Sequence, residues 1–139
     1  MDNFEAFESY LDAKDIKYKE DSFDDGDRFI VIPQKIQNGV LLNVLLIFSR
    51  IKIKILVLGI GSLEDESKRE ALYEIFNKFN LETGFFKMYL RGNDVCVECD
   101  MATDVFDGEF NPKKFMNFIM AALFTIDNSY RDIVKILWF

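Results

Sequence analysis

The sequence predicts an α+β domain in which an antiparallel sheet of about five strands carries helices on one face. Two segments, residues 40–58 and 85–101, have the strand–turn–strand pattern of a β-hairpin. Amphipathic segments with a helical period begin the chain, separate these hairpins and end the chain. The expected order is helix, a weakly patterned strand, three strands, helix, two strands and helix. Grouped strands and helices of this kind are typical of α+β folds rather than of alternating βαβ units.

Residues 2–13 have the pattern of a short amphipathic helix. Asp2 can cap its N-terminus, and Glu5 follows at the position that the capping box gives to glutamate. The apolar stripe of this helix consists of Phe4, Phe7 and Leu11. Residues 16–20 alternate only weakly, and their lysines discourage pairing between sheet edges, so we expect an edge strand there.

The next strand is predicted over residues 28–32, which are rich in β-branched and aromatic side chains. Pro33 has no N–H group to give to a sheet, so we expect the strand to end at this residue. Asn38 and Gly39 then mark a turn.

Residues 40–48 and 51–58 are predicted to form a hairpin with Ser49 and Arg50 as its turn. The resulting pairs are Phe48 with Ile51, Leu46 with Ile53, Val44 with Ile55 and Leu42 with Val57. These pairs make one face of the hairpin wholly apolar. The opposite face carries Leu41, Leu45, Leu56 and Leu58 beyond Lys52 and Lys54. A single antiparallel sheet normally leaves one face wet, so this second apolar patch requires either a dimer partner or a helix to cover it.

The hairpin over residues 85–101 fixes its own register, because the Gly92-Asn93 turn places Arg91 opposite Asp94. One of its faces is apolar and is expected to lie under the last helix. That face consists of Phe86, Met88, Leu90, Val95, Val97 and Cys99. A slip of one residue would bury Lys87 and Glu98 instead.

Two further helices complete the predicted fold. Residues 59–62 are expected to end a strand, after which Ser62 or Asp65 can cap a helix that runs to about residue 81. The last helix begins at Pro112 and runs to about residue 137, with Asn111 as its cap. Its first half carries extra apolar side chains, among them Phe118 and Phe124. The two aromatic residues that follow, Trp138 and Phe139, are expected to be packed.

Composition limits the classes of function. The 139 residues predict one domain over residues 1–139, and the 15 phenylalanines argue against disorder. A net charge of -7 opposes binding to nucleic acid or to an anionic membrane. The start of the chain lacks the pattern of a secretory signal, so we expect a cytoplasmic protein with reduced thiols.

The residues that carry chemistry are few. Cys96 and Cys99 form a C-x-x-C pattern, but a strand directs them to opposite faces, so we expect no metal, no cofactor and no redox site. There is no histidine to act as a general base. Two carboxylate pairs could hold a cation or act as acid and base: Asp104 with Asp107, and Glu98 with Asp100. A solvated loop and a polar strand face explain these pairs better, since no convergent ligands or apolar pocket accompany them, and we predict no catalytic residue.

The segment Ile75-Phe76-Asn77-Lys78-Phe79-Asn80, followed by Gly84-Phe85-Phe86 and the hairpin, resembles the bacterial YbjN-like family. Members of that family are described as sensory transduction regulators with a fold like that of type III secretion chaperones. The resemblance implies a dimerising, chaperone-like α+β domain without established catalysis, and gives Asn77, Asn80 and Gly84 a structural role. Two asparagines three residues apart can cap carbonyls, tie the helix end to the hairpin, or bind a partner's backbone.

The sequence therefore predicts a non-catalytic domain that binds protein or peptide, as a chaperone or regulator, and that forms a homodimer. The candidate interface residues are Leu41, Leu45, Leu56, Leu58, Phe118 and Phe124. The alternative is a small-molecule-binding protein or a carboxylate-based enzyme with a pocket between the sheet and a helix.

Overall fold

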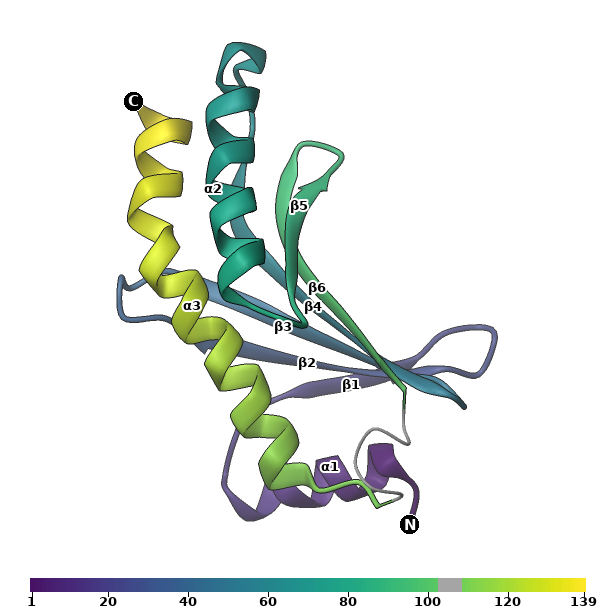
Figure 1. Cartoon of the computed structure of the whole chain (residues 1–139). Coiled ribbons are helices and arrows are strands. Elements are labelled where there is room, and N and C mark those ends of the chain that lie inside the picture. Colours follow the sequence, from purple (N-terminus) through teal and green to yellow (C-terminus); the bar gives the residue numbers. More distant parts are fainter. Residues whose placement is uncertain (103–108) are drawn as a thin grey trace.

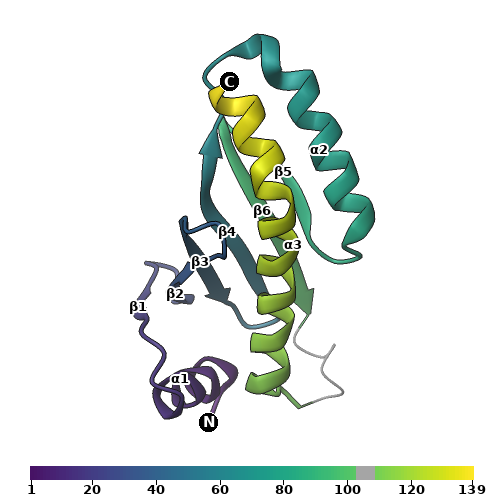
Figure 2. The same cartoon turned by 90° about the vertical axis from the view of Figure 1, so that its left-hand side faces the viewer.

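The computed structural model describes residues 1–102 and 109–139, which fold into a six-stranded antiparallel sheet with three α-helices on one of its faces (Figures 1 and 2). The fold is α+β, as predicted, with six strands in place of about five. The elements are α1 (Asn3–Ala13), β1 (Lys19–Ser22), β2 (Arg28–Lys35), β3 (Leu41–Phe48), β4 (Lys52–Ser62), the 3₁₀ helix η1 (Glu66–Lys68), α2 (Arg69–Glu82), β5 (Lys87–Arg91), β6 (Asp94–Ala102) and α3 (Pro112–Trp138).

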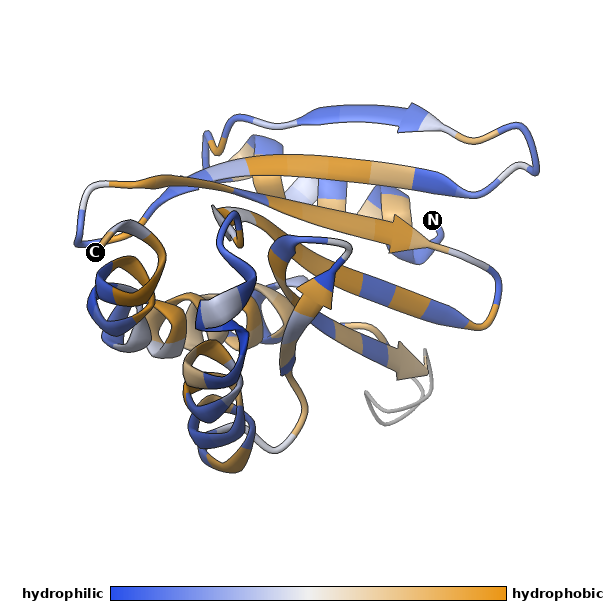
Figure 3. Ribbon diagram, turned by 90° about the horizontal axis from the view of Figure 1, so that it is seen from above, coloured by the Kyte–Doolittle hydropathy of each residue, from blue (hydrophilic) through white to orange (hydrophobic). Residues whose placement is uncertain are grey.

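The strands lie in the order β1-β2-β3-β4-β6-β5, and all neighbours are antiparallel. The first four strands follow the chain, and β6 then pairs with β4, so that the second hairpin extends the sheet. Figure 3 shows β2 and β3 as hydrophobic along most of their length, whereas the first part of β4 alternates with hydrophilic residues. This difference between the strands matters for the outer face described below.

The start of the sheet differs from the prediction in two ways. The edge strand β1 begins at Lys19 and ends at Ser22, so it lies slightly later than the predicted segment. The strand β2 does not end at Pro33 but continues to Lys35. The edge strand pairs with β2 only as far as Val31. Pro33 therefore lies where β2 is itself the edge of the sheet, a position at which proline is tolerated.

The hairpin of β3 and β4 has a register two residues away from the predicted one. Phe48 pairs with Ile53, not with Ile51. The reason is the turn, because the N–H of Ser49 donates to the carbonyl of Lys52 at 3.0 Å and leaves residues 50 and 51 as the loop. A shift of two residues keeps every side chain on its predicted face.

The strand β4 passes through the glycine-containing segment at which it was expected to end. Val57 pairs with Val97 but Gly61 pairs with Val95, so β4 contains extra residues that form a bulge. Gly59 has a φ angle of +92° within this bulge, a conformation that glycine adopts easily. The 3₁₀ helix η1, which leads into α2, is capped by Asp65, whose side chain accepts from the N–H of Ser67 at 3.0 Å.

The hairpin of β5 and β6 has the predicted register, from Arg91 opposite Asp94 to Lys87 opposite Glu98. Of the six side chains expected to be covered, five are buried and Leu90 is half-buried. Two helices, rather than the last helix alone, provide the cover. Phe118 of α3 packs against Phe86 with ring centroids 4.8 Å apart, and the end of α2 is hydrogen-bonded to β5.

The core lies between the sheet and the three helices. The helix α1 is held by its predicted apolar stripe, with Phe7 packed on Phe115 of α3 at 5.1 Å and Phe4 packed on Phe48 of β3 at 5.5 Å between ring centroids. The helix α3 begins after Asn111, whose side chain accepts from the N–H of Lys114, and ends at Trp138. The expectation that the C-terminal aromatics are packed is wrong, because Trp138 and Phe139 are exposed.

Candidate functional site

The sheet face opposite the helices is left without a second layer by the described residues. In the described residues, α1, α2 and α3 all lie on the other face (Figures 1 and 2). The outward-pointing side chains of β2, β3 and β4 are nevertheless mainly apolar. We call the five of them that are half-buried the open face: Phe29, Val31, Leu45, Ile47 and Leu58. Four of them are neighbours across β2 and β3, since Phe29 pairs with Ile47 and Val31 with Leu45, whereas Leu58 on β4 pairs with Asn43.

The strands β4 and β6 border the open face with ion pairs. The Nζ atom of Lys54 lies 3.2 Å from a carboxylate oxygen of Glu98 and 3.7 Å from one of Asp100. Lys52 lies 3.9 Å from Asp100. The carboxylate pair Glu98 and Asp100 is thus matched by two lysines on the next strand, which is the arrangement of a polar strand face. The other pair that the sequence offered, Asp104 with Asp107, lies outside the described residues.

The four leucines predicted as interface residues differ in exposure. Leu41, at the start of β3, is 57% exposed, and Leu45 and Leu58 are half-buried. Leu56 points to the same side but is only 2% exposed, because it lies between Leu45 on β3 and Glu98 on β6. Three of these leucines are therefore accessible to a partner molecule, whereas Leu56 contributes only by packing beside Leu45.

The cysteines lie on opposite sides of the sheet, as the strand pattern predicts. Cys99 faces the helices and Cys96 faces outward beside Tyr89, and both are buried. Burial raises the pKa of both thiols, that of Cys99 to about 11, so both are protonated at neutral pH. In the described residues, three or more His, Cys, Asp or Glu side chains are nowhere grouped in a way that could hold a metal ion.

A second apolar surface lies on α3. Phe124 is 63% exposed, and Met120, one turn earlier, is exposed as well. We call these two residues the α3 ridge. A hollow of about 230 Å³ borders the ridge on the side of the β2–β3 loop and is lined by Ile36, Leu123 and Asp127 among others. No helix of the described residues, the 27-residue α3 included, has the apolar stretch that a bilayer span requires.

Another hollow, of about 200 Å³, lies between α3 and the loop before β5. Its walls include Gly84 and Phe118, two residues that the sequence singled out. Phe118 is half-buried and packs on Phe85 as well as on Phe86, so it belongs mainly to the packing between α3 and the hairpin.

The asparagines singled out in the sequence have different surroundings. The Nδ2 atom of Asn80 donates to the carbonyl of Met88 at 3.2 Å, and the N–H of Met88 donates to Oδ1 of Asn80 at 2.7 Å. This pair of bonds ties the end of α2 to β5, which is itself an edge strand. Asn77 is exposed, and its side chain makes no hydrogen bond to the described part of the chain. Gly84 is exposed and has open space where a Cβ atom would lie.

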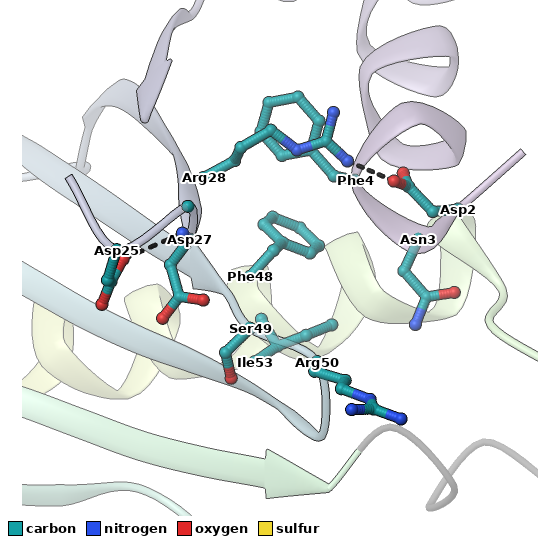
Figure 4. Close-up of a pocket in the computed structure, with 11 residues that line it drawn as sticks. Asp2, Asn3, Phe4, Asp25, Asp27, Arg28, Phe48, Ser49, Arg50 and Ile53 are labelled. Carbon is teal, nitrogen blue, oxygen red and sulfur yellow. Dashed lines mark hydrogen bonds and ion pairs between the residues drawn. The ribbon is translucent and has the colours of Figure 1, made fainter. Parts of the chain in front are cut away.

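A pocket of about 480 Å³ lies at the start of α1 (Figure 4), and no pattern in the sequence predicts it. Arg28 lies over the ring of Phe4, 4.2 Å from its centroid, and forms an ion pair with Asp2. Burial raises the pKa of the Asp2 carboxyl, but the hydrogen bond from the N–H of Glu5 and the charge of Arg28 outweigh it and lower the pKa overall. Asp2 is therefore ionised and paired at neutral pH, which is the state of a structural contact rather than of a general acid. The Asp2–Arg28 pair joins residues 26 positions apart, which is why no local pattern marks it.

Comparison with known proteins identifies the family. A model of the YbjN family, described as "Putative bacterial sensory transduction regulator", matches residues 3–134. This range begins with α1 and includes all six strands and most of α3. Searches of curated proteins and of solved structures gave no match. Because the match covers nearly the whole chain, the protein belongs to the YbjN family.

Proposed function

We propose that the chain is a cytoplasmic, non-catalytic regulatory domain that binds other proteins through the open face and acts as a homodimer. The observation that carries the proposal is the apolar surface of β2, β3 and β4 on the side without helices. The uncovered face of an antiparallel sheet is normally polar, and a contiguous exposed apolar surface is typical of an interaction site. A chaperone-like role would use the same face to hold a client segment.

The family description supports regulation rather than catalysis. The pocket in Figure 4 gives little support to the alternative of a carboxylate-based enzyme, because Asp2, one of the three aspartates in its lining, is paired with Arg28 and has a lowered pKa. A general acid at neutral pH needs a raised pKa instead.

The α3 ridge supports self-association at a place separate from the open face. Phe124 is exposed beside a hollow that is large enough for an aromatic side chain. In a two-fold pair each Phe124 would occupy the hollow of the other copy, which is the reciprocal contact that such symmetry requires. The open face, on the far side of the sheet, would then stay free for a different protein.

Two matched variants separate these roles. Leu45→Gln makes the open face more polar, and Phe124→Gln does the same for the α3 ridge, without a change of net charge. In affinity capture from an extract of the source cell, we expect Leu45→Gln to lose specific partners that the original chain and Phe124→Gln retain. Retention of all partners by Leu45→Gln, with the fold intact by circular dichroism, would exclude the open face as the binding surface.

Sedimentation velocity tests the dimer with the same two variants. We expect the original chain and Leu45→Gln to sediment as dimers at micromolar concentration and Phe124→Gln to sediment as a monomer. A monomeric original chain would remove the dimer from the proposal. If Leu45→Gln alone became monomeric, the open face would be the dimer interface and the assignment of the two surfaces would have to be exchanged.

A further inference from the structure

We infer that the partner of the open face is a protein segment in which apolar residues adjoin a cluster of Lys or Arg. This inference rests on the proposed function and adds the chemistry of the partner. It follows from the continuity of the open face with an aromatic pair and from the uneven distribution of charge around it.

The apolar surface continues beyond β2 onto the β1–β2 hairpin tip. Phe23, which is 43% exposed, lies with its ring centroid 4.8 Å from that of Phe29. Phe29 in turn is paired with Ile47 across the strands. A segment bound on β2 and β3 would therefore reach the hairpin tip without leaving apolar surface.

This end of the surface is acidic. Asp21 pairs with Phe29 across β1 and β2, and the tip adds Asp24 together with Asp25 and Asp27, which also line the pocket of Figure 4. The arginine next to the tip, Arg28, already forms an ion pair with Asp2 on α1. We call these four aspartates the acidic tip: Asp21, Asp24, Asp25 and Asp27.

The other borders of the open face do not carry such an excess of negative charge. Lys52 and Lys54 lie within 4 Å of Glu98 or Asp100, so the charges along β4 and β6 are matched. Lys19 pairs with Val31, two residues before Asp21 on β1. A partner that brings cations to the acidic tip and apolar side chains to β2 and β3 would thus match both features of the surface.

The same charges disfavour other occupants. Nucleic acid and anionic membranes would bring negative charge to the acidic tip. A basic and apolar protein segment is the partner that the charges favour.

Two fluorescent synthetic peptides test the inference. Both contain the same alternating leucines and serines, followed by a run of lysines in one peptide and of glutamates in the other. By fluorescence anisotropy at low salt we expect the lysine peptide to bind at least about tenfold more tightly, with a ratio that falls as salt screens the charges. Equal binding of the two peptides, or binding of neither, would overturn the inference.

Charge variants test whether the acidic tip causes the preference for the lysine peptide. Changing all four aspartates of the acidic tip to asparagine removes four charges but keeps the turn acceptors, since Oδ1 of Asp25 accepts from the N–H of Asp27 and Oδ1 of Asp21 from that of Ser22. The matched control removes four exposed charges from α2, the segment before it and α3. It combines Glu64→Gln, Glu70→Gln, Glu74→Gln and Asp132→Asn. We expect the tip variant to weaken binding of the lysine peptide about tenfold and the control to leave it nearly unchanged.

The outcomes separate the two proposals. If the tip variant and the control weaken binding equally, net charge rather than the acidic tip attracts the peptide and the inference is wrong. The open face itself is tested by Leu45→Gln, which we expect to weaken both peptides. If Leu45→Gln leaves both unchanged, the proposed binding surface is wrong; if it weakens both while the tip variant has no effect, only the partner chemistry is wrong.

Discussion

Leu45 and Leu46 are neighbours on β3 with opposite surroundings. Leu46 faces the helices and is fully buried, whereas Leu45 faces outward and is half-buried. Both pair with apolar residues on the adjacent strands, Leu46 with Ile30 and Ile55 and Leu45 with Val31 and Leu56. An apolar side chain in a strand therefore does not by itself identify the core. In the part of the chain that the structure describes, helices cover only one of these two faces.

The two faces differ because only the inner face carries the contacts that hold the helices. The inner face receives the apolar stripes of α1 and α3, such as Phe7 and Phe115, together with the bonds of Asn80 to Met88. The outer face has no such attachment in the described residues and carries the matched charges of β4 and β6 instead. The comparison thus separates a packed core from a surface that is available to another molecule.

The largest expected difference is between Leu46→Ala and Leu45→Ala. We expect Leu46→Ala to lower the free energy of unfolding by about 2–5 kcal/mol, because it leaves a cavity in a closed core. Leu45→Ala should cost less than about 1 kcal/mol, because water already reaches that side chain. Urea denaturation of the two variants measures both values. Equal losses would mean that a second molecule covers the outer face in solution.

A smaller loss is expected where α2 is tied to β5. Asn80→Ala removes two hydrogen bonds and leaves the N–H and carbonyl of Met88 without these partners, which should cost about 1–3 kcal/mol. Asn77→Ala, three residues earlier on the same helix, should stay within about 0.5 kcal/mol. Thermal unfolding of the pair provides the measurement. A similar loss from Asn77→Ala would point to a contact of that residue with another molecule.

The contact of α3 with the end of β4 is expected to give an effect of about 1 kcal/mol. A Cβ atom on Gly61 would lie 2.6 Å from Cδ1 of Leu137, so Gly61→Ala must displace that side chain. Leu137 is half-buried near the end of α3 and can partly move away. Gly84→Ala, where nothing lies within 4 Å, is the control and should change stability by less than about 0.5 kcal/mol. Thermal unfolding of the two variants provides the measurement. A lower midpoint for Gly84→Ala than for Gly61→Ala would contradict the contact.

The smallest effect concerns the attachment of α1 to β2. The pKa of Asp2 is lower in the folded chain than its ordinary value of 3.8, so the folded state binds fewer protons and gains stability as pH rises. Asp2→Asn keeps the helix cap but loses the charge pair with Arg28, which should cost less than about 1 kcal/mol. The difference from the original chain should be constant above about pH 5 and vanish as pH falls through the folded pKa. Urea titrations at several pH values measure the free energies of unfolding of both chains. A difference between them that persisted in acid would contradict the prediction.

The elements with local signals were the most predictable. The hairpin of β5 and β6 has the register that Gly92-Asn93 dictates, and α3 begins after Asn111 as its cap residue predicts. The register of β3 and β4 differs from the prediction because two overlapping turns were possible, and hydrogen bonds from the N–H and the hydroxyl of Ser49 to the carbonyl of Lys52 close one of them. Leu45 could be placed on the outer face from the strand pattern. The near-complete burial of Leu56 could not, because it depends on Glu98 of a distant strand.

The sequence alone determined the fold class, the order of the elements and the two-sided apolarity of the first hairpin, because strand and helix periods are local properties of the chain. The tertiary structure decided the rest. The pairing of β6 with β4 and the docking of all three helices on one face depend on contacts between residues far apart in the chain. Those contacts leave Leu45 facing outward with Val31 and Ile47, on the surface that we propose for a partner.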